Sequence, residues 1–221
     1  MKSVFYHRVI LIVLFHFGLF KLELAAQKST SVFEAKTLTW YGLDFSHAKM
    51  VGQFAQFKDA GQKGGESIKN TYFNAWNNVI KAEPDKYELN KFLHTDKVNL
   101  ELEKVNNINS KVDDSQLMSM QATENKFSSE QIQKMIRKYA NTGQGIGVVF
   151  LVEKFDKFEN QGYVQVVYFD EKNGEVLFSD RLNGKSGGFG IKNYWIKSIY
   201  NIFKDIENSK WRKWKKKASK G

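Results

Sequence analysis

The last third of the chain contains three strand-like runs in succession, and these constrain the fold more than any other feature. Residues 146–155 (IGVVFLVEKF) form a nearly continuous run of β-branched and aromatic residues, which is typical of a central strand. Residues 163–169 (YVQVVYF) predict the next strand, and residues 176–182 predict a third. Asn173-Gly174 lies between the last two runs and supplies the positive φ of a tight turn, so the sequence predicts a β-hairpin.

A glycine-rich loop over residues 184–190 and a long amphipathic helix follow this hairpin. The helix carries one apolar stripe that repeats at helical spacing. The residues of this stripe are Ile191, Trp195, Ile199, Ile202, Phe203 and Ile206. Glycine lets a chain turn sharply and lets a helix approach its neighbour closely, so we expect the helix to pack against the hairpin.

The first half of the chain changes between strand and helix patterns. Residues 37–50 predict a strand with a bend or bulge at Gly42. Residues 66–81 carry apolar side chains at a period near 3.6 and predict an amphipathic helix. Pro84 ends that unit, and we expect it to open a short second helix over residues 85–93.

The middle of the chain contains one strand pattern, one polar stretch and one helix pattern. Residues 98–104 alternate apolar and polar side chains and predict a half-buried strand. Residues 106–125 are rich in Asn and Ser, have little periodicity, and predict one long polar loop. Ser128 precedes a helix in the pattern of an N-cap. Its apolar face consists of Ile132, Met135, Ile136 and Tyr139.

The order of elements is therefore strand, two helices, strand, helix, three strands and helix. We expect a single α+β domain over residues 27–221, with a mostly antiparallel sheet of about five strands covered by helices. A mature chain of about 195 residues is long enough to bury one sizeable core. Aromatic residues make up 14% of the sequence and proline occurs once, which favours a packed globule over a disordered chain.

The N-terminus has the organisation of a secretory signal peptide. Basic residues precede an apolar run over residues 9–20, and two alanines follow just before Gln27. The apolar run is shorter than the roughly 20 residues that a membrane-spanning helix needs. The sequence therefore predicts a signal peptide over residues 1–26 and an exported chain that begins near Gln27, with an uncleaved N-terminal anchor as the alternative.

The absence of cysteine and the basic net charge describe the mature protein. Without cysteine, the chain has no disulfides, thiolate metal sites, cysteine nucleophiles or lipid attachment at a lipobox. An exported domain without disulfides is held by its core alone, which favours a bacterial source. The net charge is +10, and loss of residues 1–26 leaves +8, because that segment holds three Lys or Arg residues and one Glu.

The tetrapeptide at residues 183–186 (NGKS) lies between a strand and a helix, as a phosphate-binding P-loop would. The P-loop pattern requires a glycine five residues before Gly184, and that position is Ser179 within the predicted strand. We therefore expect no nucleotide binding. A weaker alternative is an anion contact at the backbone N–H groups of the helix start. The residues of that contact are Lys185, Ser186, Gly187 and Gly188.

The sequence contains no complete catalytic or metal-binding pattern. His47 and His94 are the histidines that follow the signal segment, and no HExxH-type spacing exists. Asp44 and His47 flank Ser46, but their odd separation on a strand points the two side chains to opposite faces. We therefore assign no catalytic residue, no metal ligand and no cofactor, and expect a binding protein rather than an enzyme.

Acidic residues around the predicted hairpin leave an enzymatic alternative open. These residues are Asp156, Glu159, Asp170, Glu171, Glu175 and Asp180. A glycosidase uses two carboxylates at a set separation, so the alternative is a hydrolase that acts on an envelope polymer through acidic residues near 163–182. Most of these residues lie at predicted strand ends and turns, where charged side chains usually stay solvated, so we favour the structural interpretation.

The C-terminal segment 208–221 concentrates cations and tryptophan. It contains Lys210, Trp211, Arg212, Lys213, Trp214, Lys215, Lys216 and Lys217, followed by Lys220. The dipole at a helix C-terminus accounts for two or three of the cations. Tryptophan with Lys and Arg also seats helices on anionic membrane surfaces. We predict a tail that binds an anionic lipid or polysaccharide rather than nucleic acid, and that can be removed after Asn208 without loss of the fold.

Two sequence stretches, YVQVVYFDEKNGEVLFSDRL and GKSGGFGIKNYWIKSIY, carry a family resemblance. With the strand before them they make the segment 145–200, about a quarter of the chain, resemble small uncharacterised secreted or periplasmic proteins of Bacteroidetes-type bacteria. The layout is similar to the α/β domains of the curli-assembly and TolB N-terminal type. The resemblance implies an envelope setting without a catalytic signature. We therefore expect a non-catalytic binding module in the periplasm or at the cell surface, with an envelope protein or an anionic envelope component as its partner.

Overall fold

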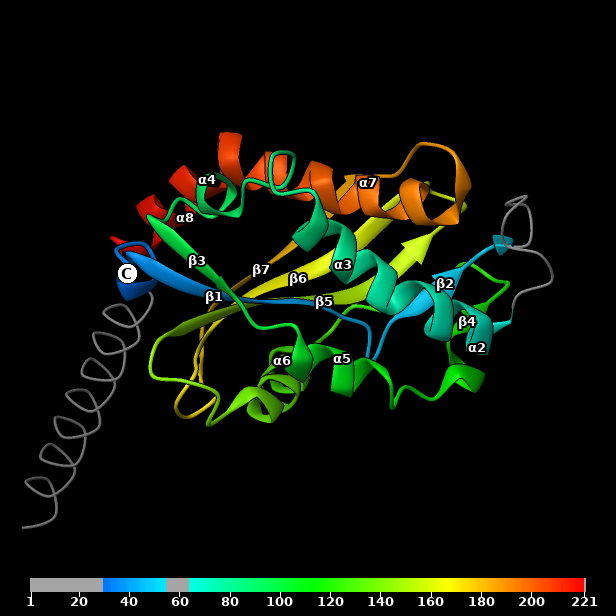
Figure 1. Ribbon diagram of the computed structural model, residues 1–221, viewed down its shortest axis with the longest axis horizontal. Helices are drawn as coiled ribbons and strands as arrows, with labels where there is room; N and C mark the ends of the chain where they lie inside the picture. The colour runs from blue at the N-terminus through cyan, green and yellow to red at the C-terminus, as the bar shows by residue number, and fades with distance from the viewer. Residues whose placement is uncertain (1–29, 55–63, 221) are drawn as a thin grey trace, which may run out of the picture.

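A mostly parallel β-sheet forms the centre of the computed structural model, which describes residues 30–54 and 64–220 (Figure 1). Its strands are β1 (Thr37–Asp44), β2 (Lys49–Val51), β3 (Lys97–Leu100), β4 (Met118–Ser119), β5 (Ile146–Asp156), β6 (Gln161–Asp170) and β7 (Val176–Lys185). The signal peptide predicted over residues 1–26 lies outside the described residues.

The pairing of these strands contradicts the mostly antiparallel sheet that the sequence predicts. β1 pairs in parallel with β3 and β5, and β2 pairs in parallel with β4 and β5. β1 and β2 lie opposite successive parts of β5, around residues 147–151 and 154–156. β5, β6 and β7 are antiparallel neighbours, so the predicted C-terminal hairpin is confirmed. The fold class is therefore α/β rather than α+β.

The parallel pairing follows from the helices that separate the strands. These are α2 (Gly65–Ile68), η2 (Lys69–Phe73), α3 (Asn74–Ala82), α4 (Leu89–Phe92), α5 (Glu103–Asn109), η3 (Asp114–Gln116), α6 (Ser129–Ile136) and η4 (Arg137–Tyr139). Three further helices, α7 (Gly190–Asp205), η5 (Ile206–Lys210) and α8 (Trp211–Ala218), follow the last strand. The helices between β1 and β3 carry the chain back across the sheet, so that β3 runs parallel to β1. The C-terminal hairpin strands are antiparallel, and extending their pattern to the whole sheet leaves out this crossover.

Most local predictions agree with the helices observed. The helix predicted over residues 66–81 is present as α2, η2 and α3, which continue one another through a π turn. α4 occupies part of the second helix predicted over residues 85–93. α6 begins after Ser128, whose hydroxyl accepts the Gln131 N–H at 3.3 Å, while the Gln131 side chain accepts the Ser128 N–H at 2.8 Å. This reciprocal pair is a capping box.

The segment predicted as one long polar loop, residues 106–125, contains regular structure instead. The end of α5, η3 and the short strand β4 lie within it. Val112 and Leu117 are buried, so a few widely spaced apolar side chains fix a segment whose composition is otherwise polar. β3 is also shorter and more exposed than the half-buried strand predicted over residues 98–104, with Leu100 44% exposed.

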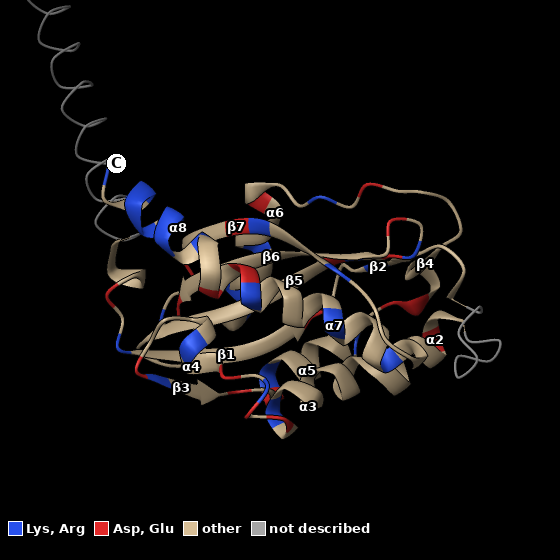
Figure 2. Ribbon diagram, turned by 90° about the horizontal axis from the view of Figure 1, so that it is seen from above, with Lys and Arg blue, Asp and Glu red and all other residues tan. Residues whose placement is uncertain are grey.

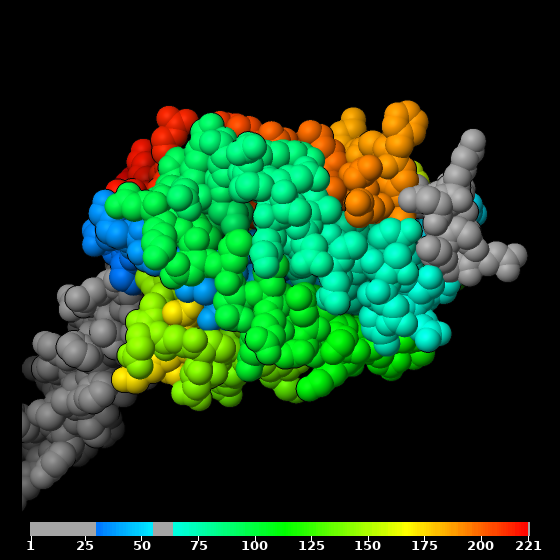
Figure 3. Space-filling view, viewed as in Figure 1, coloured from blue at the N-terminus to red at the C-terminus, as the bar shows by residue number. Residues whose placement is uncertain are grey.

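Helices cover both faces of the sheet. α3 and α7 lie side by side over one face, as seen from above in Figure 2, and α5 and α6 lie against the other face (Figure 1). In the space-filling view the cyan and green residues of the chain's second quarter cover much of the side that faces the viewer (Figure 3). No helix in the described part of the chain is both long enough and apolar enough to cross a membrane.

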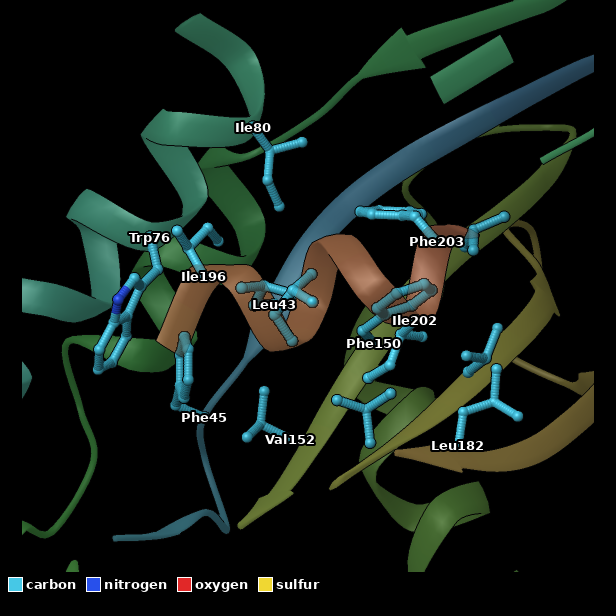
Figure 4. Packing of buried hydrophobic residues seen from close by; sticks show 14 of the residues in the cluster. Leu43, Phe45, Trp76, Ile80, Phe150, Val152, Leu182, Ile196, Ile202 and Phe203 are labelled. Atoms are coloured by element: carbon cyan, nitrogen blue, oxygen red, sulfur yellow. The ribbon is translucent and has the colours of Figure 1, made fainter. Parts of the chain in front are cut away.

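Buried side chains form a core on each face. On the α7 face, Trp76 of α3 and Phe203 of α7 pack in one cluster with Phe150 of β5 (Figure 4). On the α6 face, Met135 belongs to a second cluster with Tyr41 of β1. β5 contributes alternate side chains to both clusters, as a central strand of a three-layer sandwich does.

Two glycines have the backbone conformation that the sequence predicts for them. Gly42 has a φ of +103°, and the register between β1 and β5 shifts between Trp40 and Gly42, so the predicted bulge is present. Gly174 has a φ of +66° in the turn of the hairpin. A side chain at either position would be strained, because L-residues seldom adopt a positive φ.

Candidate functional site

Two buried asparagines hold the carboxyl end of β1. The Leu43 N–H donates to Asn77 Oδ1 at 2.7 Å, and the Phe45 N–H donates to Asn109 Oδ1 at 2.7 Å. Both asparagine Nδ2 groups donate to the Leu43 carbonyl oxygen, at 3.1 and 2.9 Å. β3 has ended at this level, so side chains from α3 and α5 replace the neighbouring strand and satisfy the backbone of β1.

Asp44 stabilises the turn that follows β1. The residue is fully buried, its Oδ1 accepts the Ser46 N–H at 2.7 Å, and its Oδ2 accepts the Tyr139 hydroxyl at 2.8 Å. Burial raises the pKa of Tyr139 well above its usual value, so the hydroxyl remains a donor. Asp44 is therefore a structural anchor, and the turn that it holds places the side chain of His47 at the surface.

The residues after this turn line a pocket with a volume of about 630 Å³, here called the basic pocket. The segment around Asp113, the segment 125–127 and α6 complete its wall. Its basic side chains are His47, Lys49, Lys126, Lys134 and Lys138. Phe127 and Met135 add apolar surface. The pocket lies at the turn after the carboxyl end of β1, and turns in this position often carry ligand contacts in α/β proteins.

The charges of the basic pocket are mostly uncompensated. Lys126, Lys134 and Lys138 form no ion pair with any carboxylate in the described part of the chain. Partial desolvation of the ring and the nearby Lys138 lower the pKa of His47, against the opposing effect of Asp44.

Asp113 brings a carboxylate into the wall of the basic pocket. Its Oδ1 accepts both the hydroxyl of Ser115, at 2.7 Å, and the Ser115 N–H, at 3.0 Å. These bonds lower the pKa of Asp113, so the residue is ionised at neutral pH. One carboxylate beside four lysines leaves the pocket positive and suited to an anion.

Few features of the sequence predict this pocket. Its basic residues come from the end of β1, the start of β2, the segment before α6 and α6 with η4. In the sequence His47 stands near Asp44, and no local pattern associates His47 with a lysine of the pocket. The spacing of Lys134 and Lys138, four residues apart on a helix, is one signal that places two of the cations on the same side.

The predicted C-terminal site is the end of a long helix rather than a free tail. α7, η5 and α8 continue one another from Gly190 to Ala218. Trp211 is 7% exposed, and its ring lies 5.0 Å from that of Phe33 and 5.1 Å from that of His94, between centroids. Trp211 therefore belongs to the core and is not free to enter a membrane.

Trp214 is also part of the core. It is 4% exposed, its ring centroid lies 5.0 Å from that of Phe178, and its Nε1 donates to Asp180 at 2.7 Å. Removal of the segment after Asn208 stays a prediction to be tested, and the burial of both tryptophans between α8, β7 and the N-terminal segment leads us to expect that it destabilises the fold.

The cations of α8 and of the turn after it are exposed, whereas Trp211 and Trp214 are buried, and this exposed set is here called the cationic face; Figure 2 shows the Lys and Arg residues of α8 in blue. The cationic face consists of the exposed residues Arg212, Lys213, Lys215, Lys216, Lys217 and Lys220. Lys210 lies beside it, with its Nζ 3.8 Å from Asp205. Among the described residues, no carboxylate forms an ion pair with any member of the cationic face.

The glycine-rich loop offers fewer free donors than its sequence predicts. Lys185 is the last residue of β7. The Ser186 N–H donates to the Asn160 carbonyl at 2.9 Å, and the Gly187 N–H donates to the Tyr194 carbonyl at 3.0 Å. Gly188 has a φ of +109° and precedes α7 by two residues. Two backbone N–H groups of the loop, those of Ser186 and Gly187, therefore bond the β5–β6 turn and α7 and are not available to an anion.

The acidic residues near the hairpin have structural partners. Asp156 accepts a hydrogen bond from Lys154 Nζ at 2.8 Å. Glu171 is buried and accepts the Tyr41 hydroxyl and the Gly145 N–H, both at 2.9 Å. Asp180 accepts the Trp214 Nε1–H. A glycosidase needs two carboxylates that face a bound sugar, and these three carboxylates serve the fold instead.

A buried ion pair lies on the α6 face of the sheet and was not expected from the sequence. Glu153 is fully buried, and Arg181 Nε lies 2.6 Å from Glu153 Oε2. The Gln165 side chain donates to the other carboxylate oxygen at 3.1 Å. The register of β5 shifts between Val152 and Lys154, and this bulge places Glu153 where β6 and β7 supply its partners. The pair is satisfied internally and offers no free group to a ligand.

Comparison with protein-family models, with curated proteins and with solved structures finds no match. No group of three or more His, Asp or Glu side chains within residues 30–54 and 64–220 is arranged to hold a metal ion. Function is therefore best sought in two positively charged features, the cationic face of α8 and the basic pocket.

Proposed function

We propose that this chain is an exported protein of the bacterial cell envelope that acts by binding, and that the cationic face of α8 attaches it to an anionic lipid surface. The observation that carries the proposal is a set of six exposed cations on α8 and in the turn after it, without carboxylate partners among the described residues. The signal segment, the absence of cysteine and the resemblance of residues 145–200 to envelope proteins support the compartment.

The cationic face is unfavourable for the helix itself. Two pairs of like charges, Arg212 with Lys216 and Lys213 with Lys217, lie four residues apart within α8. Each such pair destabilises a helix by about 0.2–0.5 kcal/mol. The helix dipole compensates cations in the last turn alone. An anionic lipid surface attracts each nearby cation with a free energy of about 1 kcal/mol. A partner of this kind therefore explains why the charges are concentrated here.

Attachment through this face would be electrostatic, without insertion of aromatic side chains. Trp211 and Trp214 are buried, so the membrane would meet lysine and arginine alone. Exposed charges interact over about 10 Å at 0.1 M salt and about 3 Å at 1 M salt. Binding should therefore be reversible and should weaken steeply as the salt concentration rises.

The N-terminal end of the described chain lies beside α8. Phe33 packs on Trp211, and the blue N-terminal segment adjoins the red C-terminus in Figures 1 and 3. In the alternative to cleavage, an anchor over residues 9–20 would be joined to the described chain at Thr30, three residues before Phe33. Both processing routes are compatible with α8 facing the lipid.

Sedimentation with vesicles tests the proposal. The mature chain from Gln27 should bind vesicles that contain phosphatidylglycerol and should not bind vesicles of phosphatidylcholine alone. The four-lysine variant carries Lys213→Gln, Lys216→Gln, Lys217→Gln and Lys220→Gln. Because each cation near an anionic lipid surface contributes about 1 kcal/mol, we expect its apparent affinity to fall by about 100-fold or more.

A matched variant controls for net charge. It carries Lys81→Gln, Lys111→Gln, Lys172→Gln and Lys192→Gln, four exposed lysines outside α8 that form no ion pair with a described carboxylate. It should bind the anionic vesicles as the unmodified chain does. Equal loss in both variants would attribute binding to net charge alone and would contradict the proposal, as would equal binding to the two kinds of vesicle.

A further inference from the structure

The basic pocket is a second site, on the α6 side of the sheet and separate from α8 in the chain. We propose that it binds a small organic dianion. The anionic group would lie among Lys126, Lys134 and Lys138, and an apolar portion would lie against Phe127 and Met135. This inference does not depend on attachment to a membrane, and the two sites share no residue.

The size and position of the basic pocket suit a small ligand. Its volume of about 630 Å³ lies within the range of roughly 300–1,000 Å³ that is typical of ligand pockets. It opens between the end of β1 and the start of β2, alongside β5. Turns that follow the strands of α/β sheets commonly carry ligand contacts, because the strand fixes the turn from which the contacting side chains project.

The turn that carries His47 is held in place before any ligand arrives. Asn109 bonds the backbone of Phe45, and Asp44 accepts the Ser46 N–H. Tyr139 in turn donates to Asp44 from η4, directly after Lys138 in the chain. The two walls that carry His47 and Lys138 are therefore joined by buried hydrogen bonds, and such preorganisation lowers the cost of ordering a site on binding.

The charges in the wall favour a ligand with two negative charges. Lys126, Lys134 and Lys138 have no carboxylate partner in the described chain, and Lys49 donates to the backbone carbonyl of Gln116. The single carboxylate of the wall, Asp113, is occupied by Ser115. Three uncompensated lysines exceed what one negative charge neutralises, so a phosphate ester fits the pocket better than a monocarboxylate.

The apolar part of the wall argues against inorganic phosphate as the whole ligand. Phe127 and Met135 line the same space as the lysines and are anchored in the α6 core. Ligand sites generally combine apolar walls with a few charged groups that set orientation. A dianion with a ring would use both kinds of surface, whereas a free ion would leave the apolar wall in contact with water.

Isothermal calorimetry with phenyl phosphate tests this proposal on the mature chain, with inorganic phosphate and phenol as the two halves of the probe. Phenyl phosphate should bind at least about ten-fold more tightly than either half. The Lys134→Ala/Lys138→Ala double variant should lose about ten-fold or more in affinity, because two charge-assisted contacts are removed. The Lys81→Ala/Lys192→Ala variant removes two exposed helical lysines elsewhere and should bind as the unmodified chain does.

Three results would overturn the proposal. They are absence of phenyl phosphate binding, equal affinity in the two double variants, and inorganic phosphate binding as tightly as phenyl phosphate. The four-lysine variant of α8 separates the two sites, because it should lose vesicle binding and keep phenyl phosphate binding. Loss of both activities in that variant would assign the anion affinity to α8 and would also contradict a site in the basic pocket.

The titration of His47 gives a second readout of the same site. Other charged groups that face this part of the molecule are Asp44, Lys49, Asp113, Lys126, Lys134 and Lys138. Partial desolvation of the ring lowers the pKa of His47 in the free protein, and a bound dianion should raise it. Binding of the dianion is then linked to protonation of His47, so the pKa of His47 should be higher in the complex than in the free protein. A pKa of His47 that NMR finds unchanged by saturating phenyl phosphate would contradict the proposal.

Discussion

Single side chains determine where β1 ends and what its backbone meets there. Gly42 lacks a Cβ, and a Cβ at this position would come within 2.6 Å of Asn77 Oδ1. The glycine therefore admits the asparagine that bonds both backbone groups of Leu43. Asn77 and Asn109 are 0% and 1% exposed, so their side-chain amides form hydrogen bonds with the backbone at the end of β1 and not with solvent.

Replacement of Asn77 by alanine tests this role. The change leaves the buried Leu43 N–H without its acceptor, and an unsatisfied buried donor costs about 1–3 kcal/mol. We expect the free energy of unfolding in urea to fall by that amount. Asn78→Ala, an exposed position on the same helix, is the matched control and should change stability by less than about 0.5 kcal/mol. Equal effects at the two positions would show that the amide contacts contribute nothing.

At the scale of elements, glycine determines how closely α7 packs on the hairpin. Gly162 in β6 and Gly184 in β7 both face Ser198, which is fully buried. A Cβ on Gly162 would overlap the Ser198 hydroxyl, and a Cβ on Gly184 would overlap the Ser198 carbonyl oxygen. The helix therefore lies directly on the backbone of the two strands, as the glycines before it in the sequence led us to expect.

Gly184→Ala should destabilise the protein by about 1–3 kcal/mol, because the methyl group meets helix backbone that cannot rotate away. Gly187→Ala is the control in the same loop region, since a Cβ there meets nothing within 4 Å. The control should be neutral or stabilising by up to about 1 kcal/mol, through lower entropy of the unfolded chain. Urea denaturation of both variants measures the difference. A Gly184→Ala protein as stable as the Gly187→Ala protein would mean that α7 can shift away.

Local sequence patterns predict the elements better than their partners. The turn at Gly174, the capping box at Ser128 and the stripe of α7 depend on residues a few positions apart, and each is present. The parallel pairing of Thr39 with Gly147 joins residues more than 100 positions apart, and no local pattern reports it. Strand pairing in this sheet is decided by crossovers and shared cores, which is why the antiparallel expectation failed.

The cationic face and the basic pocket also differ in how far the sequence predicts them, because the first is local in sequence and the second is not. The cationic face is contiguous in sequence, so composition alone located it, although burial of Trp211 became visible in the structure alone. The basic pocket gathers separate segments, and its lysines are ordinary surface lysines when read singly. Lys134 and Lys138 become neighbours of His47 because α6 packs against the end of β1.

At the scale of the whole molecule, the C-terminal helix closes the core against the N-terminal segment. Val32, Phe33, Trp211 and Trp214 belong to the same buried cluster, which also includes residues of β1, β5 and β7. The last helix is therefore a structural element whose outer surface is the one that we propose to bind lipid. Its inner side stabilises the fold, and its outer side carries the charges that we assign to lipid.

These two roles of α8 can be separated by experiment. A chain that ends at Lys210 loses both tryptophans, and because each buried Trp contributes about 3–5 kcal/mol, we expect a large loss of stability in urea. The four-lysine variant keeps both tryptophans and removes like-charge pairs, so it should be as stable as the unmodified chain or slightly more stable. A shortened chain of unchanged stability would mean that α8 does not close the core. A four-lysine variant that unfolds as readily as the shortened chain would mean that the lysines stabilise the fold, and the charges would then need no external partner.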